Sequence, residues 1–314
     1  MFDIIFLGTS ASAPSIHRGL SAQVIIHNEH RFLVDCGEGT QRQILKSGLG
    51  FKRLNKILIT HGHLDHILGL AGLLSTLMRW EAMEEMEIFA GRWAMRRISD
   101  LLHGVVLRGA QPPVPLHLRE IEPGLLFEDD DFSVRAFPVD HRSPDCYGFL
   151  FEENPRRPFL PAQAEALAIP PGPWRRDLVL GQAVSLPDGR VIEPDQVLGP
   201  PRPGTRLVHV GDVGKTDNLR EICQDADALV IESTYLDEEA AMADAFAHMT
   251  ARRAAELARD TGVQHLLLTH ISRRYRERDV VDEARAIFPN THVVRDFDHF
   301  QIKRGECLKV EGES

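Results

Sequence analysis

Four short apolar runs along the chain are each followed directly by a histidine or an aspartate. The runs span 56–60 (KILIT), 132–140 (FSVRAFPVD), 206–211 (RLVHVG) and 265–269 (HLLLT). Their length and composition predict β-strands. The residues that follow them are His61, His141, Asp212 and His270. Because binding sites collect where the strands of a sheet end, these four side chains are candidates for one site.

Stretches with helical spacing of apolar residues lie between the predicted strands. They span 38–46, 66–78 and 249–259, and Gly262 marks the end of the last one. The opening MFDIIFLGTS is too short and too acidic for a secretory signal, because Asp3 stands where such a signal would be basic. We therefore expect it to form a first core strand. Strands and helices therefore alternate in both halves of the chain, which predicts a layered α/β architecture.

One proline-rich segment, 155–206, interrupts this alternation. It holds 11 of the chain's 19 prolines, so it is not expected to form a regular core element. It also contains large apolar side chains, among them Phe159, Trp174 and Leu178. We therefore expect a protruding loop or hairpin with a function of its own, and a disordered linker is the alternative.

The segment His61-Gly62-His63-Leu64-Asp65-His66 places four ligand-type side chains within six residues. Zinc binds neutral histidine nitrogen and carboxylate oxygen, and catalytic zinc sites keep one position for water. A turn between His63 and Asp65 would divide the four side chains into two pairs, one for each of two metal ions. His141, Asp212 and His270 are individually weak candidates, but together they complete a two-metal site.

Charge and cysteine content limit the possible functions. The net charge of -10 argues against a nucleic-acid partner, although bound divalent ions would add positive charge that this count omits. The four cysteines (Cys36, Cys146, Cys223 and Cys307) are far apart, which favours neither disulfides nor a cysteine zinc site and suits a reducing cytoplasm. The sequence contains no run of 18 apolar residues, so no transmembrane helix is predicted.

These motifs together resemble those of the metallo-β-lactamase superfamily. The shared pattern is H-x-H-x-D-H, then a single histidine, an aspartate in a Gly-Asp turn and a final Thr-His, with Asp35 preceding them. Further segments resemble ribonuclease Z of the short form. They are the opening FLGTSASAPSIHR, AHMT at 247–250, THISRRY at 269–275 and the proline-rich insert. The resemblance extends from Phe2 to about Phe300.

The resemblance implies a single domain over 1–314 with a four-layer αββα sandwich and a Pro/Gly-rich flexible arm at 155–206. It implies that His61, His63 and His141 hold one zinc ion, that Asp65, His66 and His270 hold a second, and that Asp212 bridges them. Manganese is possible in place of zinc. Asp35 would orient a metal-bound histidine, and a simple role at its strand end is the equal alternative.

The activity implied is that of a zinc-dependent endoribonuclease. It would hydrolyse the phosphodiester at the 3′ end of precursor tRNA and so remove the 3′ trailer, using a hydroxide activated by two zinc ions. Asp65 would accept the proton of the water, and His248 would protonate the leaving oxygen. The arm would bind tRNA, with Arg156, Arg157, Arg175 and Arg176 as candidates for phosphate contacts. A cytoplasmic homodimer is also implied.

Two departures from the family pattern and two alternative functions accompany this interpretation. Val213 stands where the family usually has threonine, and Met249 replaces serine. The loss of a hydroxyl at Val213 is expected to alter hydrogen bonding around Asp212. Another hydrolase of the same fold, such as a small-molecule phosphodiesterase, lactonase or thioesterase, is the first alternative. A non-catalytic metal- or RNA-binding protein is the second, although every expected ligand position is filled.

Overall fold

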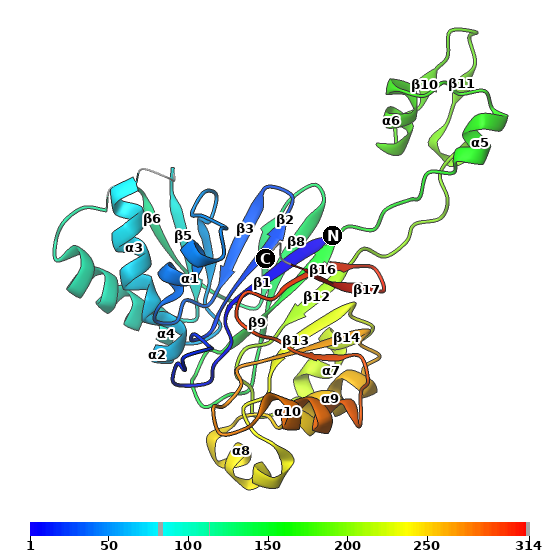
Figure 1. Cartoon of the computed structure of the whole chain (residues 1–314). Helices are drawn as coiled ribbons and strands as arrows, with labels where there is room; N and C mark the ends of the chain where they lie inside the picture. Colours follow the sequence, from blue (N-terminus) through cyan, green and yellow to red (C-terminus); the bar gives the residue numbers. More distant parts are fainter. Residues whose placement is uncertain (81–83, 113, 312–314) are drawn as a thin grey trace. The chain divides into compact units, whose positions relative to one another are not determined.

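The computed structural model describes residues 1–80, 84–112 and 114–311. Its first sheet has eight strands in the order β17-β16-β1-β2-β3-β4-β5-β6 (Figure 1). The strands are β1 (Phe2–Gly8), β2 (Ala22–His27), β3 (His30–Val34), β4 (Lys56–Leu58), β5 (Met86–Ala90), β6 (Leu116–Glu120), β16 (His299–Lys303) and β17 (Glu306–Val310). Strands β3 to β6 run parallel, so their carboxyl ends lie at one edge of the sheet.

The second sheet has seven strands in the order β15-β14-β13-β12-β9-β8-β7. They are β7 (Gly124–Glu128), β8 (Phe132–Pro138), β9 (Tyr147–Glu153), β12 (Arg206–His209), β13 (Ala228–Glu232), β14 (His265–Thr269) and β15 (Thr291–Val293). Strands β12 to β15 are parallel, and β9 pairs antiparallel with β12. The four strands predicted from the sequence are β4, β8, β12 and β14, which confirms those predictions.

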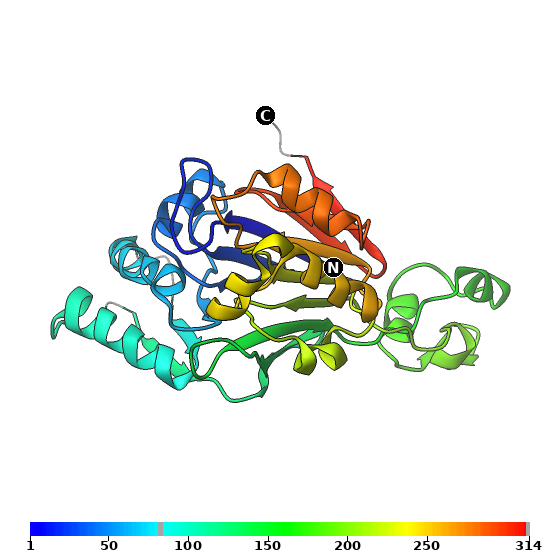
Figure 2. The ribbon, with the colours of Figure 1, turned by 90° about the horizontal axis from the view of Figure 1, so that it is seen from below.

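Helices cover the outer face of each sheet (Figure 2). Those beside the first sheet are α1 (Thr40–Lys46), α2 (Leu64–Ile67), α3 (Gly69–Trp80), α4 (Arg92–Ser99) and a π-helix (Asp100–Leu107). Those beside the second are α7 (Arg220–Cys223), α8 (Ala240–Phe246), α9 (Ala251–Asp260) and α10 (Glu277–Arg285). The predicted helix at 66–78 is divided between α2 and α3, and those at 38–46 and 249–259 correspond to α1 and α9.

Alternation along the strands explains the layers. On β1, Phe2, Ile4 and Phe6 belong to the aromatic-rich core between the sheets, whereas Ile5 and Leu7 face the helices. On β13, Val230 joins the core between the sheets and Leu229 joins the core beneath α7 and α9. Both faces of each sheet are therefore buried, which produces the αββα sandwich that the resemblance implied.

The segment Glu153–Gly204 forms a compact unit of its own, called the inserted unit here. It consists of α5 (Pro161–Ala166), α6 (Pro173–Val179), the two-stranded β10 (Val184–Ser185) and β11 (Val191–Ile192), and a short 3-10 helix (Pro194–Gln196). Proline occupies the first turn of both α-helices, where its missing N–H costs no helical hydrogen bond. Leu178, Ile169 and Val197 are among the residues of its small core.

Among the described residues, no helix has the length and apolar character needed to cross a membrane.

Candidate metal centre

The loop after β4 carries the first four candidate ligands. His63 ends the extended segment and α2 begins at Leu64, so His61 and His63 precede the helix while Asp65 and His66 lie on it. Gly62 is held close to α4, where an added Cβ would lie 2.8 Å from the Cα of Ala94. The Arg97 guanidinium donates to the Gly62 carbonyl at 2.7 Å. These contacts fix the backbone from which both histidines project.

One group of ligand atoms comes from three histidines and one aspartate. His61 Nε2 lies 2.9 Å from His63 Nδ1, and His63 Nδ1 lies 3.4 Å from His141 Nε2. Asp212 Oδ2 is 3.7 Å from His61 Nε2 and 4.0 Å from His141 Nε2. The structure therefore brings together His61, His63, His141 and Asp212, which come from three distant parts of the chain.

A second group meets at the other oxygen of Asp212. Asp212 Oδ1 lies 3.5 Å from His66 Nε2 and 3.4 Å from His270 Nε2. Asp65 Oδ2 lies 3.7 Å from His66 Nε2 and 3.5 Å from His270 Nε2. Asp212 thus presents one oxygen to each group and stands between them.

These distances fit two zinc ions. Tetrahedral coordination at about 2.0–2.1 Å places neighbouring ligand atoms roughly 3.3 Å apart, close to the separations in both groups. The Nε2 atoms of His66 and His270 are buried and have no hydrogen-bond partner among the described residues. Three buried carboxylates, those of Asp35, Asp212 and Glu232, and the partly buried Asp65 also lie in this region. Bound cations would satisfy the two nitrogens and offset the negative charge.

The ring nitrogen that each histidine turns away from its group has a hydrogen-bond partner. The pairs are His61 Nδ1 with Thr60 Oγ1 (3.0 Å), His63 Nε2 with Ser143 Oγ (2.8 Å), His66 Nδ1 with Asp35 Oδ2 (2.7 Å), His141 Nδ1 with the Ala247 carbonyl (2.7 Å) and His270 Nδ1 with Thr234 Oγ1 (2.9 Å). Such partners fix the ring orientation and the nitrogen that faces a metal. Asp35 also accepts from the Thr60 N–H at 2.8 Å.

Burial keeps part of the histidine set neutral. Burial, together with neighbouring histidines, lowers the pKa of His63 to about 4 and lowers the pKa of His61 well below its ordinary value. Burial also acts on His66, but Asp35, Asp212 and Asp65 outweigh it and raise the pKa of that ring. Neutral imidazole is the form that binds zinc, so His61 and His63 are ready ligands at neutral pH.

His248 lies beside both groups and is held by Glu232. Its Nδ1 is 2.8 Å from Glu232 Oε1 and 3.9 Å from Asp212 Oδ2. Burial alone would lower the pKa of His248, but the charge and the hydrogen bond of Glu232 raise it to about 9. The imidazolium form is therefore favoured at neutral pH, in a ring that lies beside the candidate ligands His141 and His270.

Two family models and several known proteins are similar to this chain. The family model described as Anti-Pycsar protein Apyc1 matches residues 2–157, and the one described as Beta-lactamase superfamily domain matches 196–271. Ribonuclease Z from Bradyrhizobium diazoefficiens is 43% identical over 302 residues, covering 96% of this chain and all of the relative. Ribonuclease Z from Gemmatimonas aurantiaca is 40% identical and covers 96% of each chain.

The chain belongs to the ribonuclease Z family. Its structure is similar to that of human tRNase Z, short form, with a TM-score of 0.67, 27% identity and coverage of 96% of this chain and 99% of the human one. It is also similar to the metallo-beta-lactamase fold protein YhfI from Bacillus subtilis, with a TM-score of 0.68 and 15% identity over 96% and 100% of the two chains. The latter likeness supports the fold alone.

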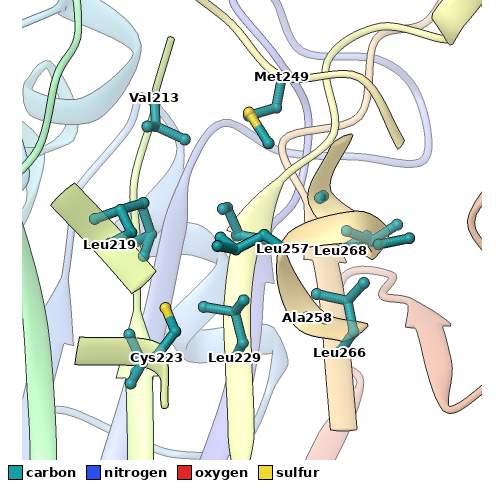
Figure 3. Close-up of a cluster of buried hydrophobic side chains, with 14 of the residues drawn as sticks. Val213, Leu219, Cys223, Leu229, Met249, Leu257, Ala258, Leu266 and Leu268 are labelled. Atoms are coloured by element: carbon teal, nitrogen blue, oxygen red, sulfur yellow. The ribbon is translucent and has the colours of Figure 1, made fainter. Parts of the chain in front are cut away.

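Both departures from the ribonuclease Z pattern fall in one apolar core. Val213 and Met249 are almost fully buried and belong to the cluster that also contains Leu219 and Leu257 (Figure 3). The Val213 backbone N–H donates to Glu232 Oε1 at 2.8 Å. Val213 therefore contacts a residue near the centre through its main chain and not through its side chain. The replaced hydroxyls thus leave two apolar side chains together in the core beside α9.

The sequence named Asp35 as a residue that would orient a histidine, and Asp35 contacts His66, but it did not identify Thr60, Ser143, Glu232 and Thr234. Glu232 ends β13, whose run DALVIEST has the same pattern of an apolar strand followed by polar residues that identified the ligands. Thr60 and Thr234 also lie at strand ends. The strand-end rule could therefore have found these residues, whereas nothing in the local sequence of Ser143 indicates its contact with His63.

The four candidate arginines of the arm lie in the inserted unit, apart from the ligands in sequence. Arg157 donates to Asp195 and to the carbonyls of Gly199 and Leu198. Arg175 donates to the Ile169 carbonyl and stacks over Phe159. These guanidinium groups are engaged within the unit, while Arg156 and Arg176 are exposed.

Proposed function

We propose that this chain is an endoribonuclease that hydrolyses the phosphodiester at the 3′ end of precursor tRNA and removes the 3′ trailer. The observation that carries the proposal is 43% identity to a Ribonuclease Z along 96% of the chain, with all seven candidate ligands clustered. The relatives and the human structure bear names that state this type of enzyme.

The proposed cofactor is a pair of zinc ions, with manganese as the alternative. His61, His63 and His141 would hold one ion, Asp65, His66 and His270 the other, and Asp212 would bridge them. When bound, two such ions neutralise the charge of a phosphodiester and make a water molecule nucleophilic near neutral pH.

Two residues are proposed to move protons. Asp65 accepts the proton of the attacking water through its carboxylate, which Ser12 holds by a backbone N–H at 3.1 Å from Oδ2. His248 carries a proton because Glu232 stabilises its charged form, and it donates this proton to the departing 3′ oxygen of the tRNA body. The products are a tRNA with a free 3′ hydroxyl and a trailer with a 5′ phosphate.

The inserted unit is proposed to be a flexible arm that binds the tRNA away from the cut. Its exposed arginines, Arg156 and Arg176, suit phosphate contacts, which position a substrate without reading its bases. Arg157 and Arg175 would act in part by holding the unit together.

A cytoplasmic homodimer is part of the same proposal. All four cysteines are buried thiols, which suits a reducing compartment. Sedimentation at several protein concentrations would test the dimer.

The decisive experiment is incubation of the zinc-loaded protein with a 3′-extended precursor tRNA, followed by mapping of both product ends. We expect one cut at the base of the trailer, leaving 3′-hydroxyl and 5′-phosphate ends. The His63→Ala variant should lose zinc and cleavage together, since it lacks one ligand. A wild-type protein that binds zinc but leaves the precursor intact would contradict the proposal.

A further inference from the structure

A pocket of about 510 Å³ is lined in part by Ile271 and Ser272, which directly follow the candidate ligand His270 in the chain. One wall is the segment after the ligand His270, including Ser272 and Arg273, and another is the N-terminal loop with Ser15 and His17. The same N-terminal loop reaches the centre, because the Ser12 backbone N–H donates to Asp65 Oδ2 at 3.1 Å. An RNA strand held at the metals would therefore pass close to this pocket.

The pocket carries excess positive charge. Arg18 and Arg295 both pair with Glu277 at 2.8 Å, and Arg18 is further tied to the Val294 carbonyl. Asp296 also faces Arg18, and Asp298 also faces Arg295, so the charges of these two guanidinium groups are offset. Among the residues that the structure describes, the unpaired positive charge of the pocket is that of Arg273. This local excess contrasts with the net charge of -10 on the chain.

Arg273 differs from the arginine next to it. Arg274 pairs with Glu239 at 3.1 Å and faces a neighbouring, acidic hollow. Arg273 is exposed and lines the basic pocket, and within the described ranges it has no hydrogen-bond or ion-pair partner. Its five donors are therefore available to a ligand.

Two serines add neutral donors. Ser15 Oγ accepts the backbone N–H groups of His17 and Arg18 at 3.2 and 3.0 Å. Ser272 Oγ accepts the Arg274 N–H at 3.3 Å. In each case the oxygen is held by the backbone, which leaves the hydroxyl hydrogen as a donor. Arginine with hydroxyl donors is a set suited to phosphate oxygens.

We propose that this pocket binds one backbone phosphate of the RNA strand beside the scissile bond, with Arg273 as its principal contact. The proposal rests on the RNA-processing function proposed above and adds a substrate subsite to it. The volume of the pocket lies within the range of sites that take a nucleotide-sized group. The phosphate comes either from the trailer or from the acceptor side of the cut.

The test compares Arg273→Ala with Arg278→Ala. Arg278 belongs to the same basic stretch, RRYRER at 273–278, but does not line the pocket. It is 87% exposed and pairs only with exposed Asp282 among the described residues, so it controls for charge. For Arg273→Ala we expect KM for the precursor to rise about fivefold. The slope of log affinity against log salt should shrink by about 0.7, the value for one single-stranded phosphate contact. Zinc content, and turnover of a nitrophenyl phosphate diester, should stay unchanged.

Substrate length separates the two sources of the phosphate. A precursor with a one-nucleotide trailer has no phosphodiester beyond the cut, so its KM should be insensitive to Arg273→Ala if the pocket holds the trailer. If the effect persists with that substrate, the phosphate belongs to the acceptor side. Equal KM values and salt slopes for wild type and Arg273→Ala on every precursor would overturn the proposal, as would equal losses in both arginine variants.

Binding measurements keep this inference separate from the proposed function. Fluorescence anisotropy with a short single-stranded RNA needs no cleavage. If wild type cleaves no precursor but Arg273→Ala still weakens RNA binding and lowers its salt slope, the pocket stands and the proposed function fails. If wild type cleaves the precursor and Arg273→Ala leaves RNA binding unchanged, the proposed function stands and the phosphate pocket fails.

Discussion

The metal centre and the inserted unit are built in opposite ways. The centre joins buried and partly buried side chains from distant segments, and each candidate histidine ligand has a hydrogen-bond partner on its other nitrogen. The inserted unit is one continuous segment around a small core, and it leaves Val179, Leu180 and Val191 more than half exposed. One region fixes a few atoms, whereas the other presents a surface.

This difference suits the proposed division of tasks, with catalysis at the centre and tRNA binding on the inserted unit. Catalytic groups must be held within fractions of an ångström, and that precision requires the rigid edges of two packed sheets. Recognition of a large RNA needs area and charge rather than atomic precision. Changes at the centre should therefore affect kcat, and changes in the inserted unit should affect KM.

Among the changes that test the contrast between the centre and the inserted unit, His248→Ala should have the largest effect on activity. Loss of the proton donor should lower kcat for precursor tRNA by about a hundredfold or more. A nitrophenolate leaving group needs no proton, so turnover of a nitrophenyl phosphate diester should fall far less. Zinc content measured by atomic absorption should match wild type. Loss of zinc, or equal losses on both substrates, would instead assign His248 a structural role.

The clustering of the candidate ligands was predictable from sequence, because residues of suitable chemistry stand together or at strand ends. His61 to His66 lie together along the chain, and His141, Asp212 and His270 each follow a recognisable strand. The αββα sandwich came from the resemblance, because apolar periodicity alone indicates layers without their order. Glu232 follows the same strand-end pattern, but the contact of Ser143 with His63 depends on packing between segments far apart in sequence, which no local pattern encodes.

The proline-rich segment shows the other limit of the sequence. Its prolines predicted irregular structure, but Pro161 and Pro173 begin short helices instead, since proline suits the first helical turn. Leu178 and Trp174 pack into or against a core of the unit itself. Apolar residues scattered among prolines gave no period from which that core could be foreseen.

An intermediate effect is expected when the inserted unit is removed. Glu152 and Arg206 are register partners on the adjacent strands β9 and β12, so the two ends of the unit meet. Deleting 155–203 joins Asn154 to Gly204, and Asn-Gly is the preferred two-residue hairpin turn. The variant should fold, and its KM for precursor tRNA should rise roughly tenfold because phosphate contacts are lost.

The control for this deletion is the small diester, whose kcat/KM should stay within about twofold of wild type because the metal ligands are untouched. Thermal unfolding of the two proteins would show whether the new hairpin holds β9 and β12 together. Equal loss of activity on precursor and diester would mean that the inserted unit supports the centre, and the proposed division of tasks would fail.

The smallest effect, and the one that examines the centre most finely, is expected for Glu232→Gln. The raised pKa of His248, about 9, favours the imidazolium below that pH, so the proposed general-acid activity is expected below about pH 9 and should be lost above it. Glutamine keeps the acceptor for the Val213 N–H but removes the negative charge. The pKa of His248 should then fall, and the alkaline limb of kcat against pH should move to lower pH.

Near pH 7 kcat should fall only several-fold in Glu232→Gln. The control is Glu239→Gln, whose carboxylate pairs with Arg274, and it should leave the pH profile unchanged. An alkaline limb that stays in place in Glu232→Gln would show that another group supplies the proton.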